Sequence, residues 1–252
     1  MKPVLIQTEN LSKSFSNGGF MQHVLKNIDL ELYAGDFTVI MGASGAGKST
    51  LLYALSGMDV PSLGKITFGG TAISEMNSDQ LAVFRRKHCG FVFQQIYLID
   101  GMSVMDNVLA AGLLVQKDKK AVLARAKELF AAVGIGEETQ QKFPSQISGG
   151  EAQRAGIVRA LINSPEILFA DEPTGALNSK TGIDVLNTMT KFNQSGQSVV
   201  MVTHDIKSAR RGNRILYLKD GSILGELNLS DYTLEDEKRQ EKLLAFLKEM
   251  GW

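Results

Sequence analysis

Two segments near the start of the chain alternate apolar and polar residues. The alternation covers residues 4–9 and 24–33, and Asn17-Gly18-Gly19 lies between them. Alternation of this kind is typical of half-buried strands, and a glycine-rich pair after asparagine is a turn signal. The pattern therefore predicts that the fold opens with an antiparallel sheet.

From residue 37 the pattern changes to short runs that are apolar throughout. These runs occupy residues 37–41, 167–170 and 198–202, and each is followed by a polar turn and a helical stretch. Strands of a parallel sheet with helices on both faces are fully buried, which produces such runs. We expect a mixed α/β fold with this sheet at its centre.

Helical periodicity dominates residues 96–163. Two helices are expected at 103–115, opened by a Ser-x-x-Asp cap, and at 117–133. A terminal amphipathic helix is expected at about 234–250. Its apolar face is expected to comprise Leu243, Leu244, Leu247 and Met250. This face would either pack on the chain's own core or serve as a docking surface.

The chain has no internal repeat and no low-complexity tract, so all 252 residues are expected to form a single domain. Within it, a core of about 1–95 and 164–230 is expected to be interrupted by a helical subdomain at about 96–163.

Composition narrows the classes of function. Lysine plus arginine and aspartate plus glutamate each total 27, so the basic footprint of a nucleic-acid-binding protein is missing and no nucleic acid partner is expected. Cys89 is the single cysteine, which favours a reducing cytosol. No run approaches the ~18 apolar residues of a membrane span. The chain is expected to be soluble alone, with any transport pathway in another polypeptide.

A glycine-rich segment, Gly-Ala-Ser-Gly-Ala-Gly-Lys-Ser-Thr at 42–50, lies between a strand-like run and a helical stretch. This is the context of a phosphate-binding Walker A loop, whose glycines let the backbone bend round phosphate oxygens. Lys48 would reach the β- and γ-phosphates, Ser49 would bind Mg²⁺, and Thr50 would support the α- or β-phosphate. The residues expected to bind nucleotide here are Gly42, Ser44, Gly45, Gly47, Lys48, Ser49 and Thr50. The sequence lacks the guanine-selecting Asn-Lys-x-Asp run, so ATP is favoured.

Two adjacent carboxylates end the apolar run at 167–170. Asp171 and Glu172 stand at the carboxyl end of a predicted strand, where α/β sheets gather their ligands. Neighbouring strand residues point to opposite sides, so the two acids need not share a role. Asp171 would bind Mg²⁺ directly or through water, and Glu172 would act as the general base on the attacking water.

The segment Ile-Ser-Gly-Gly-Glu-Ala-Gln-Arg at 147–154 resembles the signature Leu-Ser-Gly-Gly-Gln-x-Gln-Arg of the ATP-binding cassette (ABC) family. Ser148 is expected to cap a helix that runs to about residue 163, with N–H groups exposed at Gly149 and Gly150. In the family this segment binds the ATP of the partner subunit. The resemblance therefore implies a P-loop ABC ATPase fold with an antiparallel β subdomain, and a head-to-tail homodimer that holds two ATP molecules.

Further family elements follow in order over residues 2–230. Gln94 resembles the glutamine that contacts Mg²⁺ or its water, with Gln95 as an alternative. His204 resembles the switch histidine that binds the γ-phosphate. Phe15 lies where the family places an aromatic ring on adenine, although a core position is also open. The resemblance thus implies catalytic roles for Glu172, His204 and Gln94.

Two positions depart from the family pattern. Glu151 replaces the usual glutamine of the signature and adds an acid near a phosphate site, and we expect it to face away from ATP. Asn178 replaces the aspartate that normally ends the D-loop at 175–178, which removes a charge from the expected dimer interface.

Asp-Glu-Pro-Thr-Gly at 171–175 and Met-Gly-Ala-Ser-Gly at 41–45 resemble a subgroup that includes lipoprotein-releasing and macrolide-exporting ATPases. The run Gly-Ala-Leu-Asn-Ser and the final Phe-Leu-Lys-Glu-Met-Gly-Trp are most similar to the bacitracin- and lantibiotic-resistance branch. This implies an integral membrane permease on a separate chain, with the ATPase peripheral on the cytoplasmic face of the cell membrane.

A function as regulator of a membrane complex, of the cell-division type, remains an open alternative. ABC ATPases of translation or DNA repair usually have two cassettes or long coiled coils, which this sequence lacks.

Overall fold

The computed structural model describes residues 2–234, 236 and 238–252. Its first two strands, β1 (Val4–Asn17) and β2 (Phe20–Tyr33), form a long antiparallel hairpin. Gly18 and Gly19 close the turn with φ angles of 57° and 90°, which glycine adopts without steric cost. The predicted antiparallel opening is confirmed.

Both strands are longer than the alternation predicted. Asn10 and Asn27 take φ angles of 50° and 48°, and the pairing register shifts between Thr8 and Leu11. Such irregularities bend a strand and change which face its side chains take. The hydrophobic alternation therefore breaks at these points although the pairing continues.

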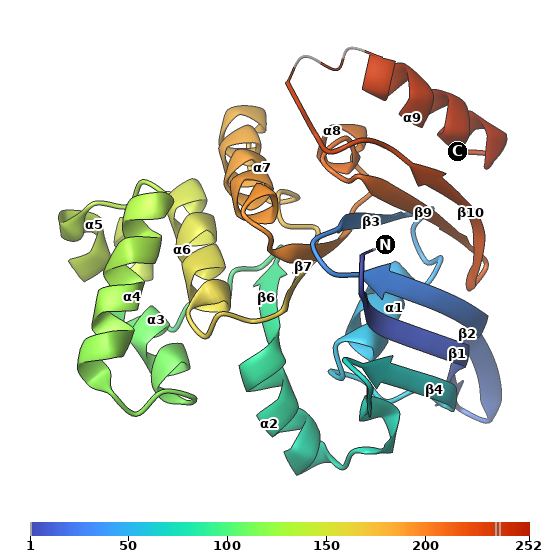
Figure 1. Cartoon of the computed structure of the whole chain (residues 1–252), viewed down its shortest axis with the longest axis horizontal. Helices are drawn as coiled ribbons and strands as arrows, with labels where there is room; N and C mark the ends of the chain where they lie inside the picture. The colour runs from blue at the N-terminus through green and yellow to red at the C-terminus, as the bar shows by residue number, and fades with distance from the viewer. Residues whose placement is uncertain (1, 235, 237) are drawn as a thin grey trace.

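Two sheets make up the β structure (Figure 1). The first has the order β2-β1-β4-β5, with β4 (Leu63–Phe68) and β5 (Thr71–Ala72) also antiparallel. The second has the order β10-β9-β3-β8-β7-β6. Its strands are β3 (Phe37–Met41), β6 (Cys89–Phe93), β7 (Ile167–Asp171), β8 (Ser198–Val202), β9 (Arg214–Lys219) and β10 (Ser222–Asn228). All neighbours in it pair parallel except β10 with β9, so the expected mixed α/β fold is confirmed.

The central sheet is covered on both faces, which explains its wholly apolar strands. Val39 and Met41 of β3 belong to one hydrophobic cluster, together with residues of the helices, and Ile40 belongs to another that includes the first sheet. Because successive strand residues face opposite sides, both sets must be apolar.

The helices pack against particular strands of the two sheets. The helix α1 (Lys48–Leu55) contacts β2, β7 and β8, and α2 (Ser78–His88) precedes β6. Helices α3 to α6 lie between β6 and β7 in the chain and gather at one end of the molecule (Figure 1). They are α3 (Val104–Leu113), α4 (Lys119–Ala132), α5 (Glu137–Gln141) and α6 (Gly149–Leu161). The two predicted helices of this segment are confirmed with slightly shorter ends, since Ser103 and Asp118 are their N-caps.

The remaining helices lie after β7. They are α7 (Ser179–Gln194), α8 (Ile206–Ala209) and α9 (Lys238–Glu249), and two short 3₁₀ turns, η1 (Ile73–Glu75) and η2 (Pro144–Gln146), occur earlier in the chain. Within the described part of the chain, no helix is both long and apolar enough to cross a membrane.

The terminal helix begins later than predicted, at Lys238, and residues 235 and 237 of the predicted span lie outside the described residues. Leu243, Phe246 and Leu247 are buried, so this face packs on the chain's own core. Leu244 of the predicted apolar face is 42% exposed and does not take part in this packing.

Candidate nucleotide-binding and catalytic site

The glycine-rich loop joins β3 to α1 and is held closely by neighbouring strands. A Cβ on Gly42 would lie 2.1 Å from the carbonyl oxygen of Leu218, and one on Gly47 would lie 2.9 Å from that of Val24. Both glycines, and Gly45, have positive φ angles. The backbone can therefore take this path only with glycine at these positions, while Ser44 and Gly45 are exposed at the loop tip.

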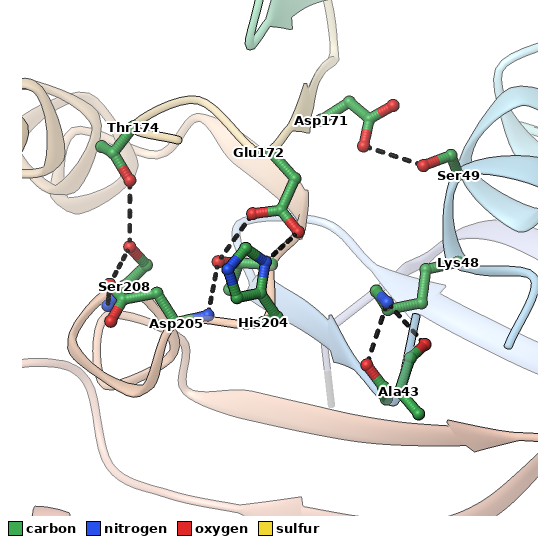
Figure 2. Close-up of polar contacts among 11 residues, drawn as sticks. Ala43, Lys48, Ser49, Asp171, Glu172, Thr174, His204, Asp205 and Ser208 are labelled. Carbon is green, nitrogen blue, oxygen red and sulfur yellow. Dashed lines mark hydrogen bonds and ion pairs between the residues drawn. The ribbon is translucent and has the colours of Figure 1, made fainter. Parts of the chain in front are cut away.

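Lys48, Ser49 and Thr50 form the first turn of α1. The Lys48 ammonium donates to the carbonyl oxygens of Gly42 and Ala43, both at 2.9 Å, and so lies across the loop (Figure 2). Burial lowers the pKa of Lys48 from its ordinary value, while the charges of Glu172 and Asp171 oppose the shift. The cation is thus held where the phosphate loop and the two acids meet.

Asp171, the last residue of β7, is held by two hydroxyl groups from α1. The Ser49 hydroxyl donates to Oδ1 at 3.0 Å, and the Tyr53 hydroxyl donates to Oδ2 at 2.8 Å. Burial and the bond to Asp171 raise the pKa of Tyr53 to about 12, so the phenol stays protonated and remains a donor.

Glu172 points to a different set of partners (Figure 2). His204 Nδ1 lies 2.8 Å from Oε1, and the Thr203 hydroxyl donates to Oε2 at 3.3 Å. The backbone of Glu172 has φ 47°, an unfavourable value for a residue with a side chain. This turn immediately after the strand directs the two adjacent carboxylates to separate groups.

A chain of hydrogen bonds supports the Glu172 side. Asp205 accepts from the Ser208 hydroxyl at 2.7 Å and its own N–H donates to Thr203 at 3.0 Å. Thr174 lies 3.3 Å from Ser208, oxygen to oxygen, which links the segment after Glu172 to α8 (Figure 2). Asp205 also caps α8, so the loop that carries His204 is fixed at both ends.

Gln94 follows β6 and lies in the same cleft as both acids. This cleft has a volume of about 510 Å³, and its lining includes Ser49, Gln94, Gln95, Asp171 and Glu172. A Cβ on Gly175 would lie 2.9 Å from the Gln94 amide nitrogen, so the amide packs directly on that glycine.

Helix α6 holds the backbone around Gln94. The Gln153 amide donates to the Phe93 carbonyl at 2.9 Å, and the Arg159 guanidinium donates to the carbonyl oxygens of Ile96 and Tyr97. The helix that begins at the signature segment is therefore connected directly to the loop that carries Gln94.

A family model described as ABC transporter matches residues 25–175, which is more than half of the chain. This chain belongs to the ABC transporter family. One relative is an uncharacterized ABC transporter ATP-binding protein of Methanocaldococcus jannaschii. It is 41% identical to this chain over 224 residues, which cover 89% of this chain and all of the relative. The bacitracin export ATP-binding protein BceA of Halalkalibacterium halodurans is 39% identical over 98% of this chain and 96% of its own.

Solved structures agree with this assignment. The dimeric ATP-binding cassette MJ0796, in a post-hydrolysis state bound to ADP and phosphate, superposes with a TM-score of 0.82 at 36% identity, covering 90% of this chain and all of that one. The predicted P-loop ABC ATPase fold is confirmed, and the chain is an ATPase that binds ATP.

The signature segment of this ABC ATPase lies apart from the phosphate loop. Ser148 caps α6, as predicted, and among the described residues Ser148, Gly149 and Gly150 make no hydrogen bond to residues 42–50. A Cβ on Gly150 would lie 2.0 Å from Cγ2 of Thr181 at the start of α7. Gly150 is thus needed within the subunit for the packing of α6 on α7.

The two departures from the family pattern both act as helix caps. The Oε2 of Glu151 accepts from the Ser148 hydroxyl at 2.7 Å and from the Ser148 N–H at 2.9 Å, and its orientation relative to ATP stays a prediction. These bonds lower the pKa of Glu151. Asn178 accepts from the Thr181 N–H at 3.0 Å and caps α7, so it retains the local role open to an aspartate.

Phe15 is 44% exposed, with the Lys13 ammonium 5.0 Å from its ring centroid. The alternative of a core phenylalanine was therefore wrong, and the ring is available for stacking.

Sequence reasoning missed Tyr53 and Thr203 as partners of the two acids. The signal for Tyr53 is its position four residues after Ser49, which places both on one face of α1. The signal for Thr203 is weaker, because its contact with Glu172 depends on how β7 and β8 pair.

Proposed function

We propose that this ABC ATPase drives a separate membrane permease in resistance to, or export of, bacitracin-like antimicrobial peptides. In this proposal it works as a homodimer, peripheral on the cytoplasmic face of the cell membrane. The choice of substrate is supported by the similarity to the bacitracin export ATPase over nearly the whole of both chains. Lipoprotein or macrolide export and a cell-division-type regulator are less favoured.

The observation that carries the catalytic proposal is the separation of the two carboxylates beside one phosphate loop. Glu172 is the general base: it takes a proton from the attacking water, while His204 at 2.8 Å and Thr203 hold its carboxylate in place. Lys48 and the loop N–H groups bind the phosphates, and Thr50 supports them. Within this scheme His204 also hydrogen-bonds the γ-phosphate.

The oxygen donors of the cleft fit Mg²⁺. Magnesium prefers oxygen ligands and keeps several waters, so one carboxylate with a hydroxyl and substrate phosphates suffices. Asp171 and Ser49 supply these groups 3.0 Å apart, and the Gln94 amide lines the same cleft. When bound, the ion neutralises charge on the phosphates.

The dimer completes the nucleotide site in this proposal. Ser148, Gly149 and Gly150 lie apart from the subunit's own phosphate loop, and they bind the ATP of the partner through the N-terminal N–H groups of α6. Phe15 stacks on adenine through its exposed ring. Similarity to a dimeric cassette supports this arrangement.

The helical segment at about 96–163 is proposed as the subdomain that contacts the permease. A groove of about 540 Å³ lies between it, α2 and β6, and its rim carries Met58, Tyr97 and Leu114, which are 44%, 60% and 61% exposed. These residues suit the apolar side of a permease helix. Tyr97 is three residues from Gln94, so a helix in the groove would reach the ATP cleft through one short segment.

Glu172→Gln tests the proposal. General-base catalysis is worth ~10²–10⁴-fold, so ATP hydrolysis should fall by that factor while ATP binding is retained. Glu166→Gln, an exposed position just before β7, is the matched control and should keep normal turnover. Full activity of Glu172→Gln would refute the assignment of the base.

The same variant should trap the ATP-bound dimer for capture from detergent-solubilised membranes of the native host. Mass spectrometry should identify a multispanning permease, and Leu114→Glu added to the trap should release it. Leu224→Glu, on the exposed side of β10, is the control. Recovery of soluble partners alone would refute the transport function and leave the ATPase intact.

A further inference from the structure

The carboxylate of Asp171 has a hydroxyl donor on each oxygen. Ser49 binds Oδ1 at 3.0 Å and Tyr53 binds Oδ2 at 2.8 Å. Both donors belong to α1, where positions four apart share a face. One rigid helix therefore fixes both ends of the carboxylate against the end of β7.

This arrangement matters because the carboxylate torsion of aspartate is intrinsically soft. The terminal torsion is broad and roughly two-fold, so one hydrogen bond leaves the plane of the group free to rock. Donors on both oxygens define the plane. A carboxylate has about four lone-pair directions, and two remain free after Ser49 and Tyr53 are bound.

We propose that Tyr53 is a positioning residue for Mg²⁺ binding, acting through Asp171. Its hydroxyl holds Oδ2 so that the remaining lone pairs of Asp171 face the cleft beside Ser49. This inference rests on the metal site of the proposed function. Tyr53 itself lines the same cleft of about 510 Å³ as Ser49 and Asp171.

A purely structural role for the Tyr53 hydroxyl predicts something different. If the bond only anchored α1 to β7, its loss would weaken the phosphate loop and therefore ATP binding equally with and without Mg²⁺. If it orients the metal ligand, its loss would reduce only the part of the affinity that Mg²⁺ contributes. The two roles are separable by one ratio of dissociation constants.

The experiment uses the full-length chain and Tyr53→Phe, which removes the hydroxyl and keeps the ring. Tyr33→Phe is the matched control, because Tyr33 also donates to a carboxylate at 2.8 Å, that of Glu31, away from the cleft. Calorimetry gives the Kd of ATP in EDTA and in saturating Mg²⁺. Partners of metal ligands are typically worth 10–100-fold in metal affinity, so the tightening by Mg²⁺ should fall about tenfold in Tyr53→Phe and stay unchanged in Tyr33→Phe.

A double-mutant cycle with Asp171→Asn gives a second measurement. If Tyr53 acts through Asp171, Tyr53→Phe should have no further effect on Mg²⁺-dependent ATP affinity in the Asp171→Asn background. An unchanged Mg²⁺ effect in Tyr53→Phe, an equal loss with and without Mg²⁺, or additive effects in the cycle would each overturn the proposal. A wild-type chain with the same ATP affinity in both conditions would instead refute the metal site of the proposed function.

Discussion

Arg239 at the start of α9 is a buried cation that holds the C-terminal helix in place. Its side chain is fully buried and donates to three backbone carbonyls, those of Arg210 at 2.5 Å, Ser230 at 2.8 Å, and Gly212. Arg210 and Gly212 follow α8, and Ser230 follows β10. One guanidinium therefore joins three segments, and Arg239→Met, which keeps an unbranched apolar stem and removes the donors, should release the helix.

The loss can be estimated from the two contributions that hold α9. Hydrogen bonds from a charged donor are worth about 1.5–3 kcal/mol each, so three would give roughly 5–9 kcal/mol if nothing relaxed. The helix can instead detach, which exposes Leu243, Phe246 and Leu247 to water at a cost of about 1.5–3 kcal/mol each before ordering costs. The free energy of detachment therefore sets an upper limit on the stability that the substitution can remove. Once detached, a helix of 12 residues is only marginally stable in water.

Hydrogen exchange of the α9 amides measures this loss directly. Arg239→Met should lower the local opening free energy by about 3 kcal/mol or more, which is at least ~100-fold faster exchange. The melting temperature of the whole chain should change less. Lys242→Met, on the exposed face of the same helix, is the control and should stay within about 0.5 kcal/mol of the wild type. Native protection of α9 in Arg239→Met would refute the reasoning.

Two further predictions concern the signature segment. Gly150→Ala should lower the free energy of unfolding in urea by about 1–3 kcal/mol, because the new Cβ would lie 2.0 Å from Cγ2 of Thr181. Thr181→Ser removes that methyl group and should restore the stability. Failure of this rescue would contradict the packing argument. Glu151→Gln should keep the capping box and lose only the charge, worth about 0.3–1 kcal/mol at a helix N-terminus. Because the folded-state pKa of Glu151 is lowered, its carboxylate stabilises the fold above the unfolded pKa of about 4.3, and this contribution disappears as the pH falls through the folded-state pKa. Melting curves of wild type and Glu151→Gln should therefore differ at neutral pH and converge in acid; a constant difference would argue against the charge.

The strands of the central sheet were predictable because burial on both faces produces short runs of residues that are apolar throughout. The predicted runs at 37–41 and 198–202 coincide with β3 and β8. The long hairpin was only partly predictable, since irregular pairing near Asn10 and Asn27 interrupts the alternation. The start of α9 was misplaced because a charged segment carries little periodic signal.

The chemistry of the phosphate loop, the two acids at 171 and 172, and the caps of α3 and α6 could all be predicted from the amino-acid sequence. Each depends on residues that are close in the chain, where backbone geometry fixes which groups can meet. Three contacts depend on the packing of separate segments: Tyr53 with Asp171, Gly150 with Thr181, and Arg239 with the carbonyls of two other segments. These contacts join separate segments of the chain, so their distances depend on how strands pair and helices pack. Local spacing places Ser49 and Tyr53 on one face of α1, but it does not determine what that face meets.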